Sequence, residues 1–238
     1  MAIYLKYSML LLIWAGGFLI AFSSINSGQE EKLLMLRDSL SRAQEWTSYE
    51  TIQTVWAEGQ QQLKIHSQAK LDPYVIWVSS AARLTETEDF RFQVFFQPDV
   101  IYIHSEGAEH WKKADYTHPV AGELQGLKEP FDLWERILLQ AKTATLTNQK
   151  DHLIYEIGLH PFRDEVHGLR FDDVVEATMT AWVSKASKQL EKTSLDVKMK
   201  PSLARIFEHV VYTTEFQSVG ETIPKELPKN AMKAERLK

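Results

Sequence analysis

The stretch FRFQVFFQPDVIYIHSEGAEHWKK, Phe90 to Lys113, decides the fold class of this chain. Apolar and polar residues nearly alternate along it, which is typical of strands that bury one face. Pro98 and Asp99 interrupt the alternation and predict a turn between two strands. One face of the first strand carries four apolar side chains: Phe90, Phe92, Val94 and Phe96. We expect so aromatic a face to turn inward, toward a helix and whatever shares the hollow with it.

Alternating patterns recur on both sides of this stretch. The further runs that predict strands are 48–59, 60–70, 73–84, 109–115, 152–159, 177–187, 188–200 and 205–220. Two segments instead have helical spacing of apolar residues, Glu31–Trp46 and 129–142. The loop 116–128 is expected to be irregular, and the proline-broken tail after 220 is expected to fray at the surface. About nine or ten strands would be too many to lie flat, because strand twist curls a long sheet.

The predicted fold class is therefore α+β. We expect a strongly curved antiparallel sheet that forms an open β-barrel, with helices covering its concave face and an N-terminal membrane helix before it. Residues 1–24 are predicted to be a signal sequence or membrane anchor, 25–31 a linker, and 32–238 the barrel domain.

The N-terminal segment suggests where the protein works. An uncharged, mostly apolar run follows Lys6 and extends to Phe22, and Glu30 and Glu31 lie beyond it. Ala21 and Ser23 also form a small-x-small cleavage signal. A membrane anchor and a cleaved signal both stay open, with a buried helix of the domain as a third alternative. The first two place the domain outside the cytoplasm, either single-pass in the cell membrane or secreted.

Composition excludes several classes of function. The formal net charge is −5, so no basic field favours nucleic acid. The chain has no cysteine, which excludes disulfides, thiolate nucleophiles and cysteine-based zinc sites.

Motifs for catalysis are equally scarce. The sequence contains no GxSxG, GxGxxG or P-loop motif. His160 and His167 are seven residues apart, which is a poor spacing for a zinc site on one helix. The histidines are interpreted as solvated loop residues, and no metal or cofactor is expected. Adjacent carboxylate pairs such as Asp172 with Asp173 lack a visible cleft that would separate their pKa values. We therefore predict that the protein is not an enzyme.

Four segments in this order resemble a known group of proteins. They are AQEWTSYE at the end of the first helix, VIYIHSEGAEHWKK, TAWVSKASKQLEKTSLDVKM and ETIPKEL. The order resembles the LolA/LppX-like superfamily of bacterial lipoprotein carriers and lipid-binding envelope lipoproteins, and is most similar to its uncharacterised Gram-positive branch. The chain departs from the lipoprotein members because it has no cysteine to lipidate. Arg83 and Arg91 are only loose candidates for the arginine that latches the lid in the periplasmic carriers.

The resemblance implies an unclosed barrel whose hydrophobic cavity accepts an acyl chain or an apolar protein segment. It implies no cofactor and no catalysis. The side chains predicted to bind this ligand are all aromatic: Trp77, Phe90, Phe92, Phe96, Tyr102, Trp111 and Trp134. Trp111 lies among charges, so it is placed at the cavity mouth or at a membrane interface. The alternative is an envelope protein–protein interaction or sensor module that uses the barrel as a scaffold.

Overall fold

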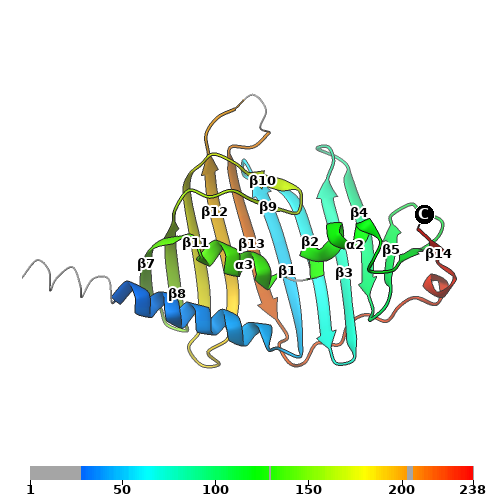
Figure 1. Cartoon of the computed structure of the whole chain (residues 1–238), viewed down its shortest axis with the longest axis horizontal. Coiled ribbons are helices and arrows are strands. Elements are labelled where there is room, and N and C mark those ends of the chain that lie inside the picture. The colour runs from blue at the N-terminus through cyan, green and yellow to red at the C-terminus, as the bar shows by residue number, and fades with distance from the viewer. Residues whose placement is uncertain (1–27, 129, 203–205, 238) are drawn as a thin grey trace, which may run out of the picture.

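The computed structural model describes residues 28–128, 130–202 and 206–237. They form one large sheet, a small two-stranded sheet and a few helices (Figure 1). The strands of the large sheet are β1 (Ser48–Ala57), β2 (Gln60–Leu71), β3 (Tyr74–Arg83), β4 (Asp89–Phe96), β5 (Ile101–Ser105), β6 (Lys112–Ala114), β7 (Ala141–Asn148), β8 (His152–Leu159), β11 (Val174–Ser184), β12 (Leu190–Met199), β13 (His209–Gln217) and β14 (Glu235–Arg236). The small sheet pairs β9 (Asp164–Val166) with β10 (Leu169–Phe171).

The helices are an N-terminal helix, which is helical from residue 28 to 44, α2 (Pro119–Lys128), α3 (Phe131–Leu138) and the short 3₁₀ helix η1 (Lys229–Lys233). The sheet order is β14-β6-β5-β4-β3-β2-β1-β13-β12-β11-β8-β7, so β14 and β7 are its two edges. All neighbours pair antiparallel except β14, which lies parallel to β6. The predicted sheet-dominated α+β fold with a few helices is confirmed.

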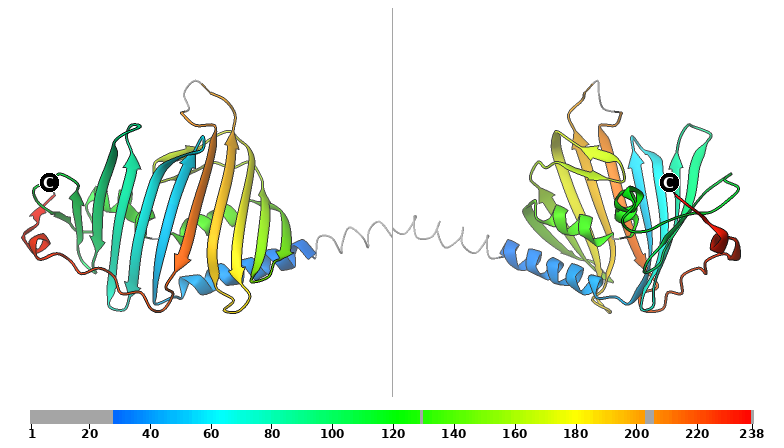
Figure 2. Two further views of the ribbon diagram at one scale, coloured as in Figure 1. Left: turned by 180° about the vertical axis from the view of Figure 1, so that it is seen from behind. Right: turned by 45° about the vertical axis from the view of Figure 1, so that its right-hand side comes forward.

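The N-terminal helix, α2, α3 and the β9–β10 hairpin all lie on one face of the sheet, as the views from two sides show (Figures 1 and 2). We call this the covered face and the opposite one the outer face. The two faces follow from strand geometry, because successive side chains of a strand point to opposite sides. Buried and less buried residues accordingly alternate along β13 from Val210 to Phe216.

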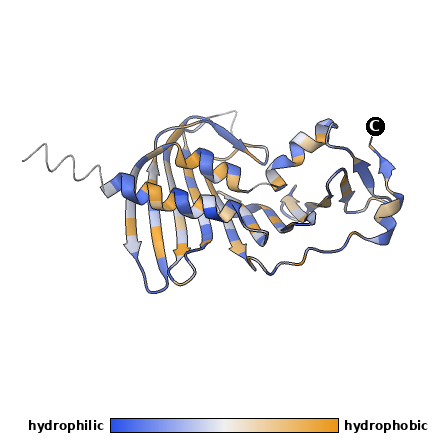
Figure 3. Ribbon diagram, turned by 60° about the horizontal axis from the view of Figure 1, so that its bottom comes forward, coloured by the Kyte–Doolittle hydropathy of each residue, from blue (hydrophilic) through white to orange (hydrophobic). Residues whose placement is uncertain are grey.

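The N-terminal helix contributes an apolar stripe to the covered face. Leu36, Leu40 and Ala43 are at most 1% exposed, and their 4-3 spacing places them on one side of the helix. The hydropathy colouring shows apolar and polar positions recurring around the helix (Figure 3). Because such a helix is stabilised mostly by the face that it buries, this contact rather than helix propensity holds it on the sheet.

Helix α3 fills the middle of the covered face. Trp134 is fully buried, and its Nε1 donates a hydrogen bond to Thr214 Oγ1 at 3.2 Å. Its ring stacks on Tyr212, with 5.4 Å between ring centroids. Ile137 is also fully buried. This part of the hollow is therefore filled by the chain itself.

The predicted irregular loop 116–128 was wrong, because residues 119–128 form α2. Gly122 and Gly126 each disfavour a helix by about 1 kcal/mol relative to alanine. Packing of Leu124 and Leu127, which are 9% and 6% exposed, outweighs that cost.

The predicted helix 129–142 was too long. It ends at Leu138, and the chain turns at residues 139–140 into the threonine-rich strand β7, which the sequence did not predict. Leu139 continues the apolar pattern but is 71% exposed. The apolar spacing therefore overestimated the length of the helix, because single apolar side chains also occur at surfaces.

The tail after residue 220 was wrongly predicted to fray. It ends in η1 and β14, and it covers a second apolar cluster on the outer face, separate from the main core. The members of this cluster are Trp77, Phe95, Trp111, Ala231 and Ala234, with Tyr102 and Leu227 packed against it. Since the residues that it covers are far away in sequence, no local pattern could have indicated this role.

The predicted membrane segment, residues 1–24, lies outside the described residues. Within the described part of the chain, none of the helices combines the length and apolar character needed to cross a membrane.

Candidate functional site

The β9–β10 hairpin covers the upper part of the sheet's covered face (Figure 1). Its turn consists of His167 and Gly168, whose φ angles are +50° and +80°. A two-residue turn with both φ values positive matches the right-handed twist of paired strands. His-Gly is not among the usual dipeptide signals for this turn, which is why the sequence was not interpreted as a hairpin.

One pocket, the rim pocket, opens beside β10 and has a volume of about 600 Å³. Its apolar lining comes from the hairpin, from β12 and β13, and from the connection between those two strands: Leu169, Phe171, Met199, Ile206, Phe207 and Val210. Arg163, Arg170, Asp172, Asp173, Gly168 and Ser202 complete its wall. Arg170 and Asp172 form an ion pair at 3.1 Å. The pocket thus combines an apolar floor with charges that partly offset one another.

A second pocket, the inner pocket, lies on the other side of the hairpin turn and has a volume of about 260 Å³. It is bounded by α2, α3, β9 and β13 through Gln125, Gly126, Pro130, Asp132, Leu133, Arg136, Glu165, Val166, His167 and Tyr212. Its lining includes three charged side chains, Asp132, Arg136 and Glu165, beside Leu133 and Val166. The turn is common to both pockets, because His167 borders the inner one and Gly168 the rim.

Two residues that line the inner pocket, His167 and Tyr212, form a hydrogen-bonded cluster with Gln53. Gln53 on β1 accepts hydrogen bonds from the Tyr212 hydroxyl and from His167 Nε2, the latter at 3.3 Å. Burial lowers the pKa of His167 to about 4, because the imidazolium would lose hydration there. Burial also raises the pKa of the Tyr212 hydroxyl. The cluster is therefore uncharged at neutral pH.

The interpretation of the histidines as solvated loop residues was wrong for His167. Its neighbours come from β1, β13 and α2, which are distant in sequence. The described residues contain no group of three histidines or carboxylates placed to hold a metal ion.

The structure separates the seven predicted ligand-binding residues into two groups. Phe92, Phe96 and Trp134 belong to the main core on the covered face, and Phe90 lies on the same face of β4 but is 43% exposed. The inward orientation of Phe92 and Phe96 is thus confirmed. The other three residues, Trp77, Tyr102 and Trp111, lie in the cluster beneath the C-terminal tail.

None of these seven side chains lines the rim pocket or the inner pocket. Trp111 does not lie at an exposed mouth, because it is 5% exposed and stacks on His104 with 4.9 Å between ring centroids. Sequence reasoning missed Leu169, Phe171 and Phe207. Its criterion was large aromatic rings on the faces of predicted strands and helices, whereas the pocket is formed by short segments that only the fold brings together.

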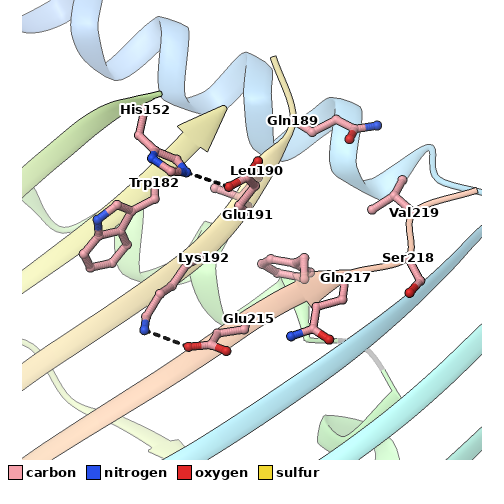
Figure 4. A pocket seen from close by; sticks show the side chains of 11 residues that line it. His152, Trp182, Gln189, Leu190, Glu191, Lys192, Glu215, Gln217, Ser218 and Val219 are labelled. Atoms are coloured by element: carbon pink, nitrogen blue, oxygen red, sulfur yellow. Dashed lines mark hydrogen bonds and ion pairs between the residues drawn. The ribbon is translucent and has the colours of Figure 1, made fainter. Parts of the chain in front are cut away.

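A third pocket of about 480 Å³ lies at the β8, β11, β12 and β13 strands and includes outer-face side chains (Figure 4). Trp182 lies there beside two pairs of charged or polar side chains. His152 Nε2 is 2.7 Å from Glu191 Oε2, and Lys192 Nζ is 2.8 Å from Glu215 Oε1. Exposed pairs of this kind contribute about 0–1 kcal/mol each. This pocket offers less apolar surface than the rim pocket, which we take as the candidate functional site.

This chain is similar to known proteins in structure but not in sequence. No family model and no curated protein matches the sequence. The lipoprotein LppX of Mycobacterium tuberculosis is similar in structure, with 10% identity and a TM-score of 0.49 over 83% of this chain and 99% of LppX. LprF of Mycobacterium bovis is similar with 9% identity and a TM-score of 0.49 over 84% of this chain and 97% of LprF.

Proposed function

We propose that this protein is a non-enzymatic, extracytoplasmic binding protein that holds a hydrophobic ligand, a lipid acyl chain or an apolar protein segment, on the covered face of its open sheet. The observation that carries the proposal is the rim pocket, whose floor is formed by the apolar side chains of Phe171, Met199 and Val210. The extracytoplasmic location comes from the predicted anchor or signal in residues 1–24, which would keep the protein tethered or release it.

Exposed apolar surface near the same end of the sheet supports the proposal. Val210 on β13 pairs with Ala57 at the end of β1, and Ala82 near the end of β3 pairs with Phe90 at the start of β4. Phe90 is 43% exposed, and Leu84 in the β3–β4 connection is 65% exposed. A chain that leaves the rim pocket along this end of the sheet would therefore meet further apolar side chains.

The size of the pocket sets the expected affinity. Burial of an alkyl chain contributes about 0.8 kcal/mol for each methylene, so six buried methylenes would contribute about 5 kcal/mol of transfer free energy. Association and ordering costs reduce that amount. We therefore expect a dissociation constant of about 0.2 mM or weaker for a single short chain.

A test is titration of the purified protein with the uncharged apolar dye N-phenyl-1-naphthylamine, together with mass spectrometry of co-purified lipid. Leu169→Glu places a charge in the rim pocket and should weaken dye binding at least tenfold. Leu139→Glu is the matched control, because Leu139 is 71% exposed and does not line the pocket. Absence of both dye binding and lipid, or equal binding by the two variants, would refute the proposal.

The alternative is an envelope interaction or sensor module that uses the sheet as a scaffold. The specific observation in its favour is that Leu36, Trp134 and Ile137 are fully buried, so the chain fills much of its own hollow. Under this alternative the dye would not bind, and no lipid would accompany the protein.

A further inference from the structure

The inner pocket adjoins the rim pocket, and its chemistry differs. Tyr212 and Val210 lie two residues apart on the same face of β13, about 7 Å along the strand, and they line the inner and the rim pocket respectively. The His167–Gly168 turn is shared between the two walls. About 7 Å along β13 thus separates the two walls, a distance that a molecule with an apolar tail and a polar head can span past the hairpin turn.

The hydrogen bonds of His167 fix what its ring presents to the inner pocket. Because Gln53 Oε1 can only accept, His167 Nε2 carries the proton in their 3.3 Å hydrogen bond. The other ring nitrogen, Nδ1, is then an acceptor. A Cβ added to Gly126 would lie 3.7 Å from His167 Nδ1 and Cε1, so this edge of the ring faces Gly126, and both residues line the pocket. The glycine leaves space beside the acceptor.

The charges around the inner pocket also favour a ligand group that donates a hydrogen bond. Asp132 on α3 and Glu165 on β9 both line it. Arg136 also lines it, but both oxygens of Asp164 accept hydrogen bonds from its guanidinium, each at 3.2 Å. The positive charge is thus engaged by a bidentate pair. An anionic head group in this pocket would lie near the carboxylate of Glu165, whereas a donor would find acceptors in that carboxylate and in His167 Nδ1.

We propose that the inner pocket binds the polar head of the ligand, and that this head is a non-anionic hydrogen-bond donor, either a hydroxyl or an amine. The inference rests on the proposed function and narrows the ligand to a neutral or cationic amphiphile.

The test compares three amphiphiles that share a lauryl-length tail: 1-monolaurin, dodecylamine and laurate. Each displaces N-phenyl-1-naphthylamine from the full-length protein at neutral pH. We expect monolaurin and dodecylamine to bind about tenfold more tightly than laurate, which is the effect of roughly one additional hydrogen bond. The ratio of the two tighter affinities distinguishes a hydroxyl from an amine.

Two variants localise the effect. Glu165→Gln removes an exposed charge at the pocket and should reduce the preference for dodecylamine over laurate by about threefold or more, while Glu156→Gln on the exposed side of β8 should leave it unchanged. His167→Asn should reduce the preference for monolaurin over laurate, and the ratio is taken within the variant so that any change in overall affinity cancels.

The outcomes separate the two proposals. Dye binding with equal affinity for all three amphiphiles, or with laurate the tightest, would overturn the head-group assignment and leave the proposed function intact. Preferences that persist in both variants would also overturn it, because the donor would then bind elsewhere. A complete lack of dye binding would instead refute the proposed function.

Discussion

Lowering the pH from 7 to 5 should destabilise this protein through His167. Burial lowers the pKa of this imidazole to about 4, against about 6.5 in an unfolded chain. The unfolded state therefore binds a proton between these two pKa values and the folded state does not. The stability that depends on a neutral His167 is therefore fully present above pH 6.5 and is lost as the pH falls toward 4.

The magnitude follows from the two pKa values. The difference between the two pKa values of His167 corresponds to roughly 3 kcal/mol in the free energy of unfolding. About 2 kcal/mol of this free energy is lost between pH 7 and pH 5. Most carboxylates are still ionised at pH 5, so acid unfolding through them does not yet dominate. With a urea dependence of about 2 kcal/mol per molar, the unfolding midpoint should fall by about 1 M.

The assay is urea unfolding at pH 7 and pH 5, followed by tryptophan fluorescence, for the wild type and for His167→Asn. Asparagine tolerates the left-handed backbone at this position, where φ is +50°. The variant should be less stable at pH 7 because it loses the hydrogen bond to Gln53. Its stability should change by about 2 kcal/mol less than that of the wild type between the two pH values.

The comparison isolates one residue, because every other histidine is present in both proteins. If His167→Asn loses the same stability as the wild type on acidification, within about 0.5 kcal/mol, then the His167 ring does not stay neutral in the folded protein. The hydrogen-bonding assignment of the inner pocket would then be wrong as well.

Two further predictions concern the apolar contacts. Leu40→Ala should lower the free energy of unfolding by about 2–5 kcal/mol, because Leu40 is 1% exposed. Leu34→Ala is the control and should change it by less than about 0.5 kcal/mol, because Leu34 is 61% exposed. Equal effects of the two substitutions in urea unfolding would contradict the orientation of the N-terminal helix. Ala231→Lys should lower the melting temperature and shift tryptophan emission to longer wavelength, because Ala231 is fully buried against the outer-face cluster. Met232→Lys is its control and should change neither, because Met232 is 76% exposed. Unchanged emission in Ala231→Lys would indicate that the tail does not cover Trp77.

Local patterns in the sequence predicted much of the fold. Period-two alternation identified β13, and helical spacing of Leu36 and Leu40 identified the N-terminal helix. These signals work because one face of each element is buried in the main core, so its apolar residues recur at the period of the element. The same alternation correctly placed Phe92 and Phe96 on one face of β4.

Neither pocket could be predicted in this way. His167, Gln53 and Tyr212 come from three segments separated along the chain, and the contact among them exists only once β1, β13 and the β9–β10 hairpin are assembled. The tail likewise gives no periodic signal, because η1 and β14 are short and cover residues from β3 and β4. By itself the sequence determined which residues share a face of each element. Only the tertiary structure decided what covers each face and where space is left, because packing between distant segments depends on their register and not on the pattern within any one of them.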